Sequence, residues 1–373
     1  MDYKKYIEKN SKKFFLLFYL IFLAFLLLTD VVIKKIYNYL EEKKTYVEKN
    51  SIYHHDLKKN YIFKDIFGNK PIIYTNLLGF KDIKIREIQN KINERRIVFI
   101  GDSFTEGVGL KFEQTFVGII YKFAKKNNIE VLNAGVQAYS PIIYWRKVKW
   151  LIEEKKFKFD ELVVYVDISD IQDEAQYYTL DNKENIISRG LQEKFIEDHN
   201  LRALFINIMD KYTFFTFRII QFLKNPHYYT AKPKDLNFNS WTIIIADGPN
   251  NKGNWTIKDL SYSKKGVALS TKYMDKLFRL CKNNNIKMTI AVYPWPNQVW
   301  YEDLDSKQVQ IWKNFSEERG IKFINNFPDF VKKKISDNDK LDIIKKYYFP
   351  ADVHFNEYGS KVIANNFINS YFK

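Results

Sequence analysis

The most restrictive feature of this 373-residue chain is its shortage of cysteine, since Cys281 is the only one. A single thiol excludes a disulfide within the chain and a cluster of thiolate metal ligands. Cys281 follows residues 273–280, where apolar side chains recur at helical spacing. That spacing favours a buried structural thiol over a reactive one. The sequence also lacks internal repeats.

Acidic residues are fewer than basic ones, with 44 Asp and Glu against 60 Lys and Arg and a net charge of +16. The basic residues do not form the clusters typical of phosphate recognition. They recur in ones, twos and threes along the chain, as at residues 34–35, 125–126 and 332–334. This distribution indicates a lysine-biased solvated surface, with attraction to anionic polymers or lipid headgroups as the alternative. We therefore expect no nucleic acid partner.

Apolar residues are plentiful and make up 46% of the chain, including 31 Phe and 26 Tyr. Such a composition is that of a globular protein and excludes a largely disordered chain. The length suits one α/β domain that carries a tail and an insertion.

The N-terminal tail contains a long uncharged run at residues 14–28, which residues 31–33 extend beyond Thr29 and Asp30. A helix over residues 14–33 would be about 30 Å long, enough to cross the apolar part of a bilayer. The following sequence "LTDVVIKK" offers no small-residue cleavage site, so an uncleaved signal anchor is favoured over a removable signal peptide. Asp30 would then lie near one headgroup layer.

The side of the membrane on which each end lies is predicted from the excess of basic residues on the cytoplasmic side. That excess is slight here, because lysines occur on both sides of the span. We expect residues 1–13 in the cytoplasm and the remainder outside the cell membrane, in the periplasm if the cell has one. Residues 34–95 are expected to form a juxtamembrane segment, a helix followed by irregular or short-strand structure around "NKPIIYTNLLGFKD". Residues 96–373 form the domain, with an insertion at about 176–285.

The domain pattern alternates short apolar runs with stretches of helical period. The runs occupy residues 96–100, 129–134, 161–167, 287–294 and 321–325. This alternation predicts a parallel sheet with helices on both faces, an α/β fold whose ligands bind beyond the carboxyl ends of the strands. Within the insertion, residues 201–223 fit an amphipathic helix packed on the domain, an interfacial helix lying on lipid or, least well, a second span. Residues 247–254 are expected to form a loop.

A hydroxyl nucleophile needs a base and a third group that orients the base. Ser103 ends the run "IVFIGDS", as expected for a hydroxyl presented at a sheet edge. Of the five histidines, only His354 has a neighbouring residue that suggests a role. It lies two positions after Asp352 in "DVHFNEYG", close enough for that carboxylate to hold the imidazole in one tautomer. The adjacent pair His54 and His55 lies in a polar, apparently exposed stretch, and we assign it no role.

Four segments, "GDSFTEG", "NAGVQAYSP", "YVDISDIQDE" and "DVHFNEYG", together resemble the SGNH/GDSL hydrolase superfamily, in the family's order. The resemblance implies a three-layer, flavodoxin-like α/β/α fold. It also implies that Ser103 is the nucleophile, His354 the base and Asp352 the orienting acid. Its oxyanion hole would use the backbone N–H groups of Ser103 and Ala138 with the Ser169 side chain.

The sequence departs from the family pattern at three of these positions. Ala138 replaces a glycine, which is a mild change unless the position needs a positive φ. Ser169 replaces an asparagine, and losing one oxyanion donor can slow a reaction roughly 10²- to 10³-fold. One residue separates Asp352 from His354 instead of two, a spacing that resembles branches handling acetyl groups on exported polysaccharides.

Simpler interpretations remain for several of these residues. Asp102 with Ser103 would serve equally well as a helix cap. Asp170, Asp173 and Glu174 resemble a metal-binding trio, although carboxylates after a strand more often cap helices, and we expect no metal and no cofactor. A substrate pocket is predicted along four side chains: Asp102, Asp170, Trp295 and Asn297.

These features predict an acyl-transfer enzyme that forms a serine ester intermediate, with O-acetyl groups of envelope glycans as the expected substrate. Attack by water would make it an esterase, and attack by a sugar hydroxyl an O-acyltransferase. An esterase for lipids or small esters is an alternative. A non-catalytic glycan-binding or assembly protein on a decayed hydrolase fold is another, because Ser169 weakens the oxyanion hole.

Overall fold

The computed structural model of the protein describes most of the chain in two compact units. One comprises residues 1–45 with 190–235, and the other residues 46–189 with 236–373. The described residues are 10–65, 68–90, 94–189, 213, 215, 216, 218, 219, 223, 254–258, 260–350 and 352–372. The predicted helix at 201–223 and loop at 247–254 therefore lie mostly outside the described residues.

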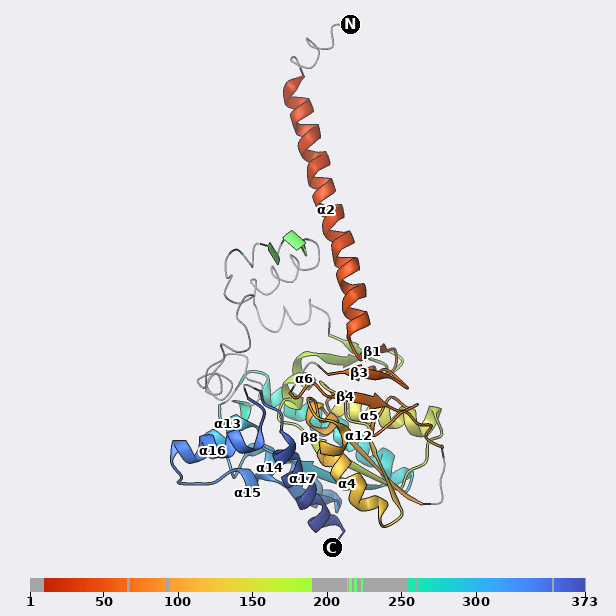
Figure 1. The fold of residues 1–373 in the computed structure, drawn as a ribbon, viewed down its shortest axis with the longest axis vertical. Coiled ribbons are helices and arrows are strands. Elements are labelled where there is room, and N and C mark those ends of the chain that lie inside the picture. The colour runs from red at the N-terminus through yellow and green to blue at the C-terminus, as the bar shows by residue number, and fades with distance from the viewer. Residues whose placement is uncertain are drawn as a thin grey trace. The chain divides into compact units, whose positions relative to one another are not determined.

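Among its described residues, the first unit contains a long helix, α2 (Ser11–Lys44) (Figure 1). Its apolar part, Ser11–Tyr37, has a mean hydropathy of 2.7 and exposed side chains, and it is long and apolar enough to cross a membrane. Asp30 is only 3% exposed. Its carboxylate accepts hydrogen bonds from the backbone N–H groups of Phe215, at 2.7 Å, and Thr216, at 3.0 Å. These bonds offset the cost of burying its charge.

The second unit is built on a parallel sheet whose strands follow the predicted apolar runs. In chain order they are β6 (Arg95–Gly101), β7 (Ile129–Asn133), β8 (Glu161–Val166), β11 (Lys287–Val292) and β12 (Lys322–Asn325). Their order across the sheet is β7-β6-β8-β11-β12. This is the 2-1-3-4-5 order of flavodoxin-like sheets, so the predicted fold class is confirmed.

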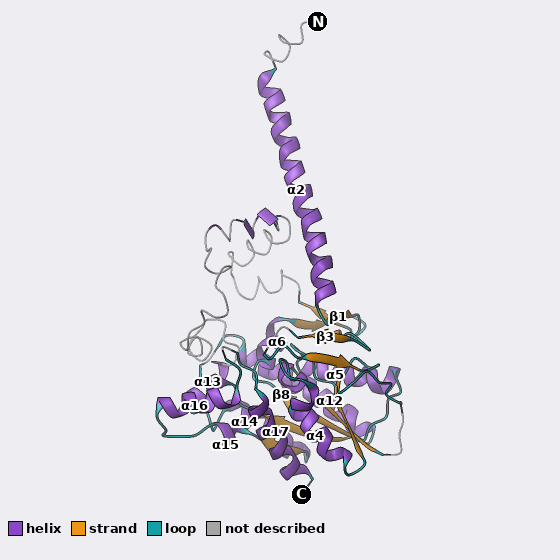
Figure 2. Ribbon diagram, viewed as in Figure 1, coloured by secondary structure: helices purple, strands orange, loops and turns teal. Residues whose placement is uncertain are grey.

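Helices cover the sheet in two groups (Figure 2). The chain moves in one direction from β6 to β7 and in the opposite direction from β7 to β8, and right-handed crossovers then place the connecting helices on opposite faces. Accordingly α4 (Phe116–Lys125) packs with α17 (Glu357–Tyr371), while α5 (Pro141–Lys149) packs with α12 (Ser263–Asn283). The direction reverses between β6 and β8, so their carboxyl ends flank the expected ligand crevice.

The segment before residue 96 takes a larger part in this unit than its predicted role as a juxtamembrane segment suggested. Strands β3 (Ile62–Lys64), β4 (Ile72–Thr75) and β5 (Lys81–Asp82) extend the main sheet beyond β7 by antiparallel pairing. A separate hairpin is formed by β1 (Val47–Asn50) and β2 (His54–Leu57). The predicted boundary at residue 96 thus falls inside one compact unit.

The predicted insertion at 176–285 also contributes regular elements. Strands β9 (Tyr178–Leu180) and β10 (Ile186–Ser188) form an antiparallel hairpin after the short helix α6 (Asp170–Gln176). Helix α12 is the crossover that leads into β11 and packs against α5 and α6. The C-terminal part of the predicted insertion, which contains α12, therefore belongs to the α/β fold itself.

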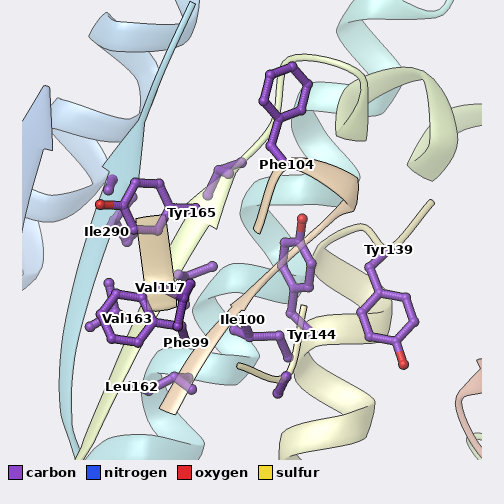
Figure 3. Packing of buried hydrophobic residues seen from close by; sticks show 14 of the residues in the cluster. Phe99, Ile100, Phe104, Val117, Tyr139, Tyr144, Leu162, Val163, Tyr165 and Ile290 are labelled. Atoms are coloured by element: carbon purple, nitrogen blue, oxygen red, sulfur yellow. The ribbon is translucent and has the colours of Figure 1, made fainter. Parts of the chain in front are cut away.

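The core lies between the sheet and its helices (Figure 3). All six residues of β8 are buried, as are the last six of β6, which fits continuous apolar strands covered on both faces. Phe99 and Tyr165 stack on one another across these two strands. Cys281 is fully buried on α12, and burial raises the pKa of its thiol to about 12. The predicted structural role of this cysteine is confirmed.

Candidate active site

Ser103 begins the short helix α3 (Ser103–Glu106) directly after the central strand β6. Gly101 allows this sharp exit, because a Cβ there would lie only 2.7 Å from the carbonyl oxygen of Tyr165. Asp102 caps the helix, since its carboxylate accepts a hydrogen bond from the Phe104 backbone N–H at 3.0 Å. The capping interpretation is therefore correct for Asp102, and the cap leaves the Ser103 hydroxyl available for another partner.

That partner is His354. The Nε2 atom of His354 lies 2.8 Å from Ser103 Oγ, and its Nδ1 atom lies 2.7 Å from Asp352 Oδ1. A carboxylate only accepts hydrogen bonds, so Nδ1 carries the proton and Nε2 is free to accept the serine hydroxyl. The structure thus brings Ser103, His354 and Asp352 into the hydroxyl–imidazole–carboxylate chain that activates a serine.

The electrostatic surroundings favour a basic imidazole. Burial disfavours a positive charge on His354, but the hydrogen bond and the charge of Asp352 outweigh it and raise the pKa of His354 above 6.5. Burial likewise opposes ionisation of Asp352, yet the hydrogen bond and charge of His354 lower its pKa. His354 is therefore set to accept a proton while Asp352 stays charged.

The loop before α17 holds His354 in place. The carbonyl oxygen of His354 accepts the Phe349 N–H at 2.9 Å, and Tyr348 and Phe355 form an isolated antiparallel bridge around it. The ring of Phe104 packs against the imidazole with a centroid separation of 4.9 Å. Backbone pairing and ring packing thus limit the rotation of the imidazole.

A buried carboxylate cluster lies beside the serine. Oxygen atoms of Asp102, Asp167 and Asp170 lie within 4.8 Å of one another, and all three side chains are at most 3% exposed. Burial and mutual repulsion raise the pKa of Asp102 to about 8 and that of Asp170 well above its usual value. Protons can therefore neutralise Asp102 and Asp170 without a metal. That the site needs no metal stays a prediction.

Protein donors already occupy much of this cluster. The Trp295 indole N–H donates to Asp167 at 2.7 Å. Hydroxyl groups of Tyr293 and Tyr144 donate to Asp102 and Asp170, at 3.0 and 2.9 Å. Two carboxylates of the trio considered from sequence remain. Asp173 is buried in the first turn of α6. Glu174 accepts the N–H of Ile142 and so caps α5, as expected for carboxylates of this kind.

Two of the three predicted oxyanion residues, Ala138 and Ser169, depart from the family pattern, each in a different way. Ala138 has a φ of 60°, in the left-handed region. The exchange of glycine for alanine is therefore not neutral for the backbone, because this conformation costs an L-residue about 1 kcal/mol or more. Ser169 precedes α6 as its N-cap, is 6% exposed and makes no capping bond with its hydroxyl.

The four predicted pocket residues are all buried. Asp102, Asp170 and Asn297 are at most 3% exposed, and Trp295 is 9% exposed. Trp295 packs its ring near Phe104, at a centroid distance of 6.1 Å. A cavity of about 570 Å³ lies elsewhere, along α4, and is lined by residues such as Tyr121 and Lys125. Substrate contact by the four residues stays a prediction.

The histidine pair that the sequence left without a role lies close to this region. His55 is 8% exposed, not exposed as expected, and its Nε2 atom lies 2.8 Å from the carbonyl oxygen of Gln137, next to Ala138. The contact joins positions 82 apart in the chain. No spacing rule connects such positions, so only the fold reveals it.

Comparisons with known proteins give similarities of fold alone. No family model matches the chain, and no curated protein matches it. A catalytic mutant of Axe2, an acetylxylan esterase from Geobacillus stearothermophilus, is 12% identical with a TM-score of 0.40, over 74% of this chain and 93% of that one. A GDSL-like lipase from Bacteroides thetaiotaomicron is 12% identical with a TM-score of 0.37, over 76% and 91%.

A third structure, the α/β hydrolase LAE5 from the metagenome of Lake Arreo in Spain, is 13% identical with a TM-score of 0.36, over 75% of this chain and 96% of that one. The strand order and the contacts around Ser103 therefore carry the functional argument.

Proposed function

We propose that the protein is a membrane-anchored serine esterase or acyl-transfer enzyme of the SGNH hydrolase superfamily, with Ser103, His354 and Asp352 as its catalytic residues. The observation that carries this proposal is the pair of hydrogen bonds from Ser103 through His354 to Asp352, beyond the carboxyl ends of β6 and β8. The four motifs of the sequence support it, because they occur in the family's order.

In the proposed reaction, Ser103 Oγ attacks the carbonyl carbon of an ester while His354 Nε2 takes the hydroxyl proton. Asp352 stabilises the imidazolium that forms. The backbone N–H groups of Ser103 and Ala138, with the Ser169 hydroxyl, bind the negatively charged oxygen of the tetrahedral intermediate. The C–O bond to the leaving alcohol then breaks, and His354 returns the proton to that alcohol.

The acyl group now on Ser103 leaves in a second step. His354 deprotonates the incoming nucleophile, which attacks the serine ester and releases Ser103 with its proton restored. If the nucleophile is water, the products are a carboxylic acid and free enzyme. If it is a sugar hydroxyl, the acyl group is transferred. The two outcomes use the same residues and differ in which acceptor reaches the serine ester.

We further propose that the substrate is an O-acetylated glycan of the cell envelope. Helix α2 supports this, because it would hold the second unit at the outer face of the bacterial inner membrane. The short Asp352–His354 spacing supports it through its resemblance to polysaccharide-modifying branches. A lipid or small-ester esterase is the alternative substrate class. The non-catalytic alternative rests on Ser169, since a weak oxyanion hole would suit a binding protein.

The test uses the full chain, purified in detergent, with p-nitrophenyl acetate. Ser103→Ala should abolish nitrophenol release above background, and a fluorophosphonate should label the wild type but not this variant. Equal release by both proteins, without labelling, would favour the non-catalytic alternative. Release of acetate from O-acetylated glycan, compared with hydrolysis of p-nitrophenyl palmitate, separates the two substrate classes.

A further inference from the structure

We propose that His55 and Tyr178 are positioning residues that hold Ala138 in the conformation the oxyanion hole requires. The inference rests on the proposed function, since it concerns the N–H group of Ala138. It assigns a task to the hairpin formed by β1 and β2, which follows the membrane helix directly in the sequence.

The first argument is the position of the His55 contact. His55 Nε2 lies 2.8 Å from the carbonyl oxygen of Gln137. This oxygen and the N–H of Ala138 belong to one planar peptide group and point in opposite directions. A donor fixed on the oxygen therefore fixes the direction of the N–H, so His55 sets where the Ala138 donor points.

The second argument is that the next peptide group is held as well. The hydroxyl of Tyr178 donates to the carbonyl oxygen of Ala138 at 2.7 Å. The peptide group before Gln137 is held too, because the backbone N–H of Gln137 donates to the Glu106 carboxylate at 2.8 Å. Both peptide groups around Ala138 are thus held by buried or half-buried side chains. Alanine does not favour a φ of 60°, so these contacts maintain a conformation that glycine would adopt more readily.

The third argument is the protonation of His55. A carbonyl oxygen only accepts, so His55 Nε2 must carry a proton. The pair His54 Nδ1 and His55 Nδ1 lies 2.8 Å apart, and His54 Nε2 lies 2.8 Å from Ser188 Oγ. Burial lowers the pKa of His55 to about 4, which keeps the ring neutral. A single directed chain results, from the Ser188 hydroxyl to His54, from His54 to His55, and from His55 to Gln137.

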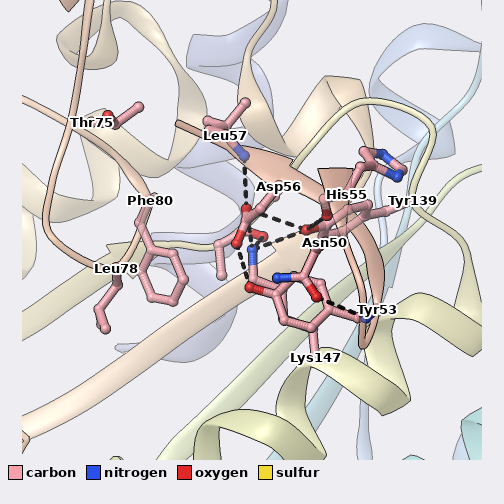
Figure 4. Close-up of polar contacts among 12 residues, drawn as sticks. Asn50, Tyr53, His55, Asp56, Leu57, Thr75, Leu78, Phe80, Tyr139 and Lys147 are labelled. Atoms are coloured by element: carbon pink, nitrogen blue, oxygen red, sulfur yellow. Dashed lines mark hydrogen bonds and ion pairs between the residues drawn. The ribbon is translucent and has the colours of Figure 1, made fainter. Parts of the chain in front are cut away.

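The hairpin is itself firmly attached to helix α5 and to the loop before it (Figure 4). Asp56, next to His55, pairs with Lys147 of α5 at 2.9 Å, and both side chains are at most 1% exposed. The Tyr53 hydroxyl donates to Asp56 at 2.8 Å, and that of Tyr139 donates to the His55 carbonyl oxygen at 2.8 Å. His55 therefore acts from a rigid support, as precise positioning requires.

The test compares three variants of the full-length protein in p-nitrophenyl acetate hydrolysis. Tyr178→Phe and His55→Leu each remove one donor and should lower kcat about tenfold or more, with KM within about twofold, because the oxyanion contact forms only in the transition state. His55→Gln restores an N–H donor and should recover most of the lost kcat. Labelling by a fluorophosphonate should slow in parallel.

Tyr371→Phe is the matched control, since it removes a hydroxyl hydrogen bond to Arg95 at the opposite end of β6. It should leave kcat unchanged. The inference fails if Tyr178→Phe and His55→Leu keep wild-type kcat while Ser103→Ala is inactive. It also fails if the substitutions change KM alone, or if the circular dichroism spectra show that both variants are unfolded. Wild-type activity in Ser103→Ala would instead overturn the proposed function itself.

Discussion

His354 Nε2 lies 2.8 Å from Ser103 Oγ although the two residues are 251 positions apart in the chain. Ser103 follows the central strand β6, and His354 precedes α17, the last helix, which packs against α4. The parallel order of the sheet brings both loops to one edge. The pair therefore exists only in the complete fold, and its chemistry can be tested by single substitutions.

Asp352→Asn should lower kcat on the order of 10³-fold. An amide can present an N–H to His354 Nδ1, which moves the ring proton to Nε2 and blocks acceptance of the Ser103 proton. Hydrolysis of p-nitrophenyl acetate measures the effect. Asp305→Asn is the control, because that carboxylate is 76% exposed and pairs with Lys333 at the surface. A fall below about tenfold would argue against Asp352 as the orienting acid.

The activity should also decline on the acid side of a pKa that lies above 6.5, since the pKa of His354 is raised. The direction follows from the role of the base: a protonated imidazole cannot accept the serine proton, so kcat/KM falls as the pH drops through this pKa. Profiles of kcat/KM between about pH 5 and pH 9 measure it. Full activity down to about pH 5.5 would contradict a role for His354 as base.

Asp102→Asn should keep most of the activity, whereas Asp102→Leu should lose it. Burial and the charge of Asp167 raise the pKa of Asp102 to about 8, so the side chain is largely protonated at neutral pH. The Ser103 hydroxyl donates to Asp102 Oδ2 at 3.1 Å in the structure. A protonated Asp102 can instead donate to Ser103 Oγ and leave the serine proton for His354. Asparagine retains both a donor and an acceptor, and leucine neither.

The same pair of variants has a pH signature. Above about pH 8 an ionised Asp102 competes with His354 for the serine proton, so the wild type should lose activity on the alkaline side. Asp102→Asn has no such group and should keep its activity there. An identical alkaline limb in both proteins would show that Asp102 does not cause it.

Ala138→Gly should raise the free energy of unfolding by about 1 kcal/mol, because glycine adopts a positive φ without the steric cost that alanine bears. Greater freedom of the unfolded glycine chain partly offsets this gain. Thermal or urea unfolding measures the change. Ala124→Gly in α4 is the control and should destabilise the protein, since its backbone is helical. Destabilisation by both substitutions would contradict a strained Ala138.

The sequence predicted the features of the fold and the site that depend on residues close together in the chain. Apolar runs with regular spacing marked the five parallel strands, because a strand buried on both faces requires continuous apolar residues. The motifs around Ser103 and His354 could be read for the same reason, since each occupies a few consecutive positions. The role assigned to each residue of the site still awaits the experiments above.

Other features were beyond such reasoning. The prediction for the juxtamembrane segment allowed for short strands, but not for residues 62–82 adding three strands to the main sheet. The exchange at Ala138 was predicted to be mild unless the position needs a positive φ, and whether it does appears only in the folded loop, where φ is 60°. His55 was expected to be exposed in a polar stretch, yet it is 8% exposed. Its neighbour Asp56 pairs with Lys147, which lies 91 positions away in the chain.

The order of residues along the chain thus determined the five parallel strands, the membrane-length helix and the candidate side chains of the site, because these depend on neighbours within a few positions. Only the tertiary structure decided which side chains meet, which are buried and which backbone angle Ala138 adopts. Packing, desolvation and hydrogen bonding between distant segments set those properties, and they arise when the sheet and its helices close around one core.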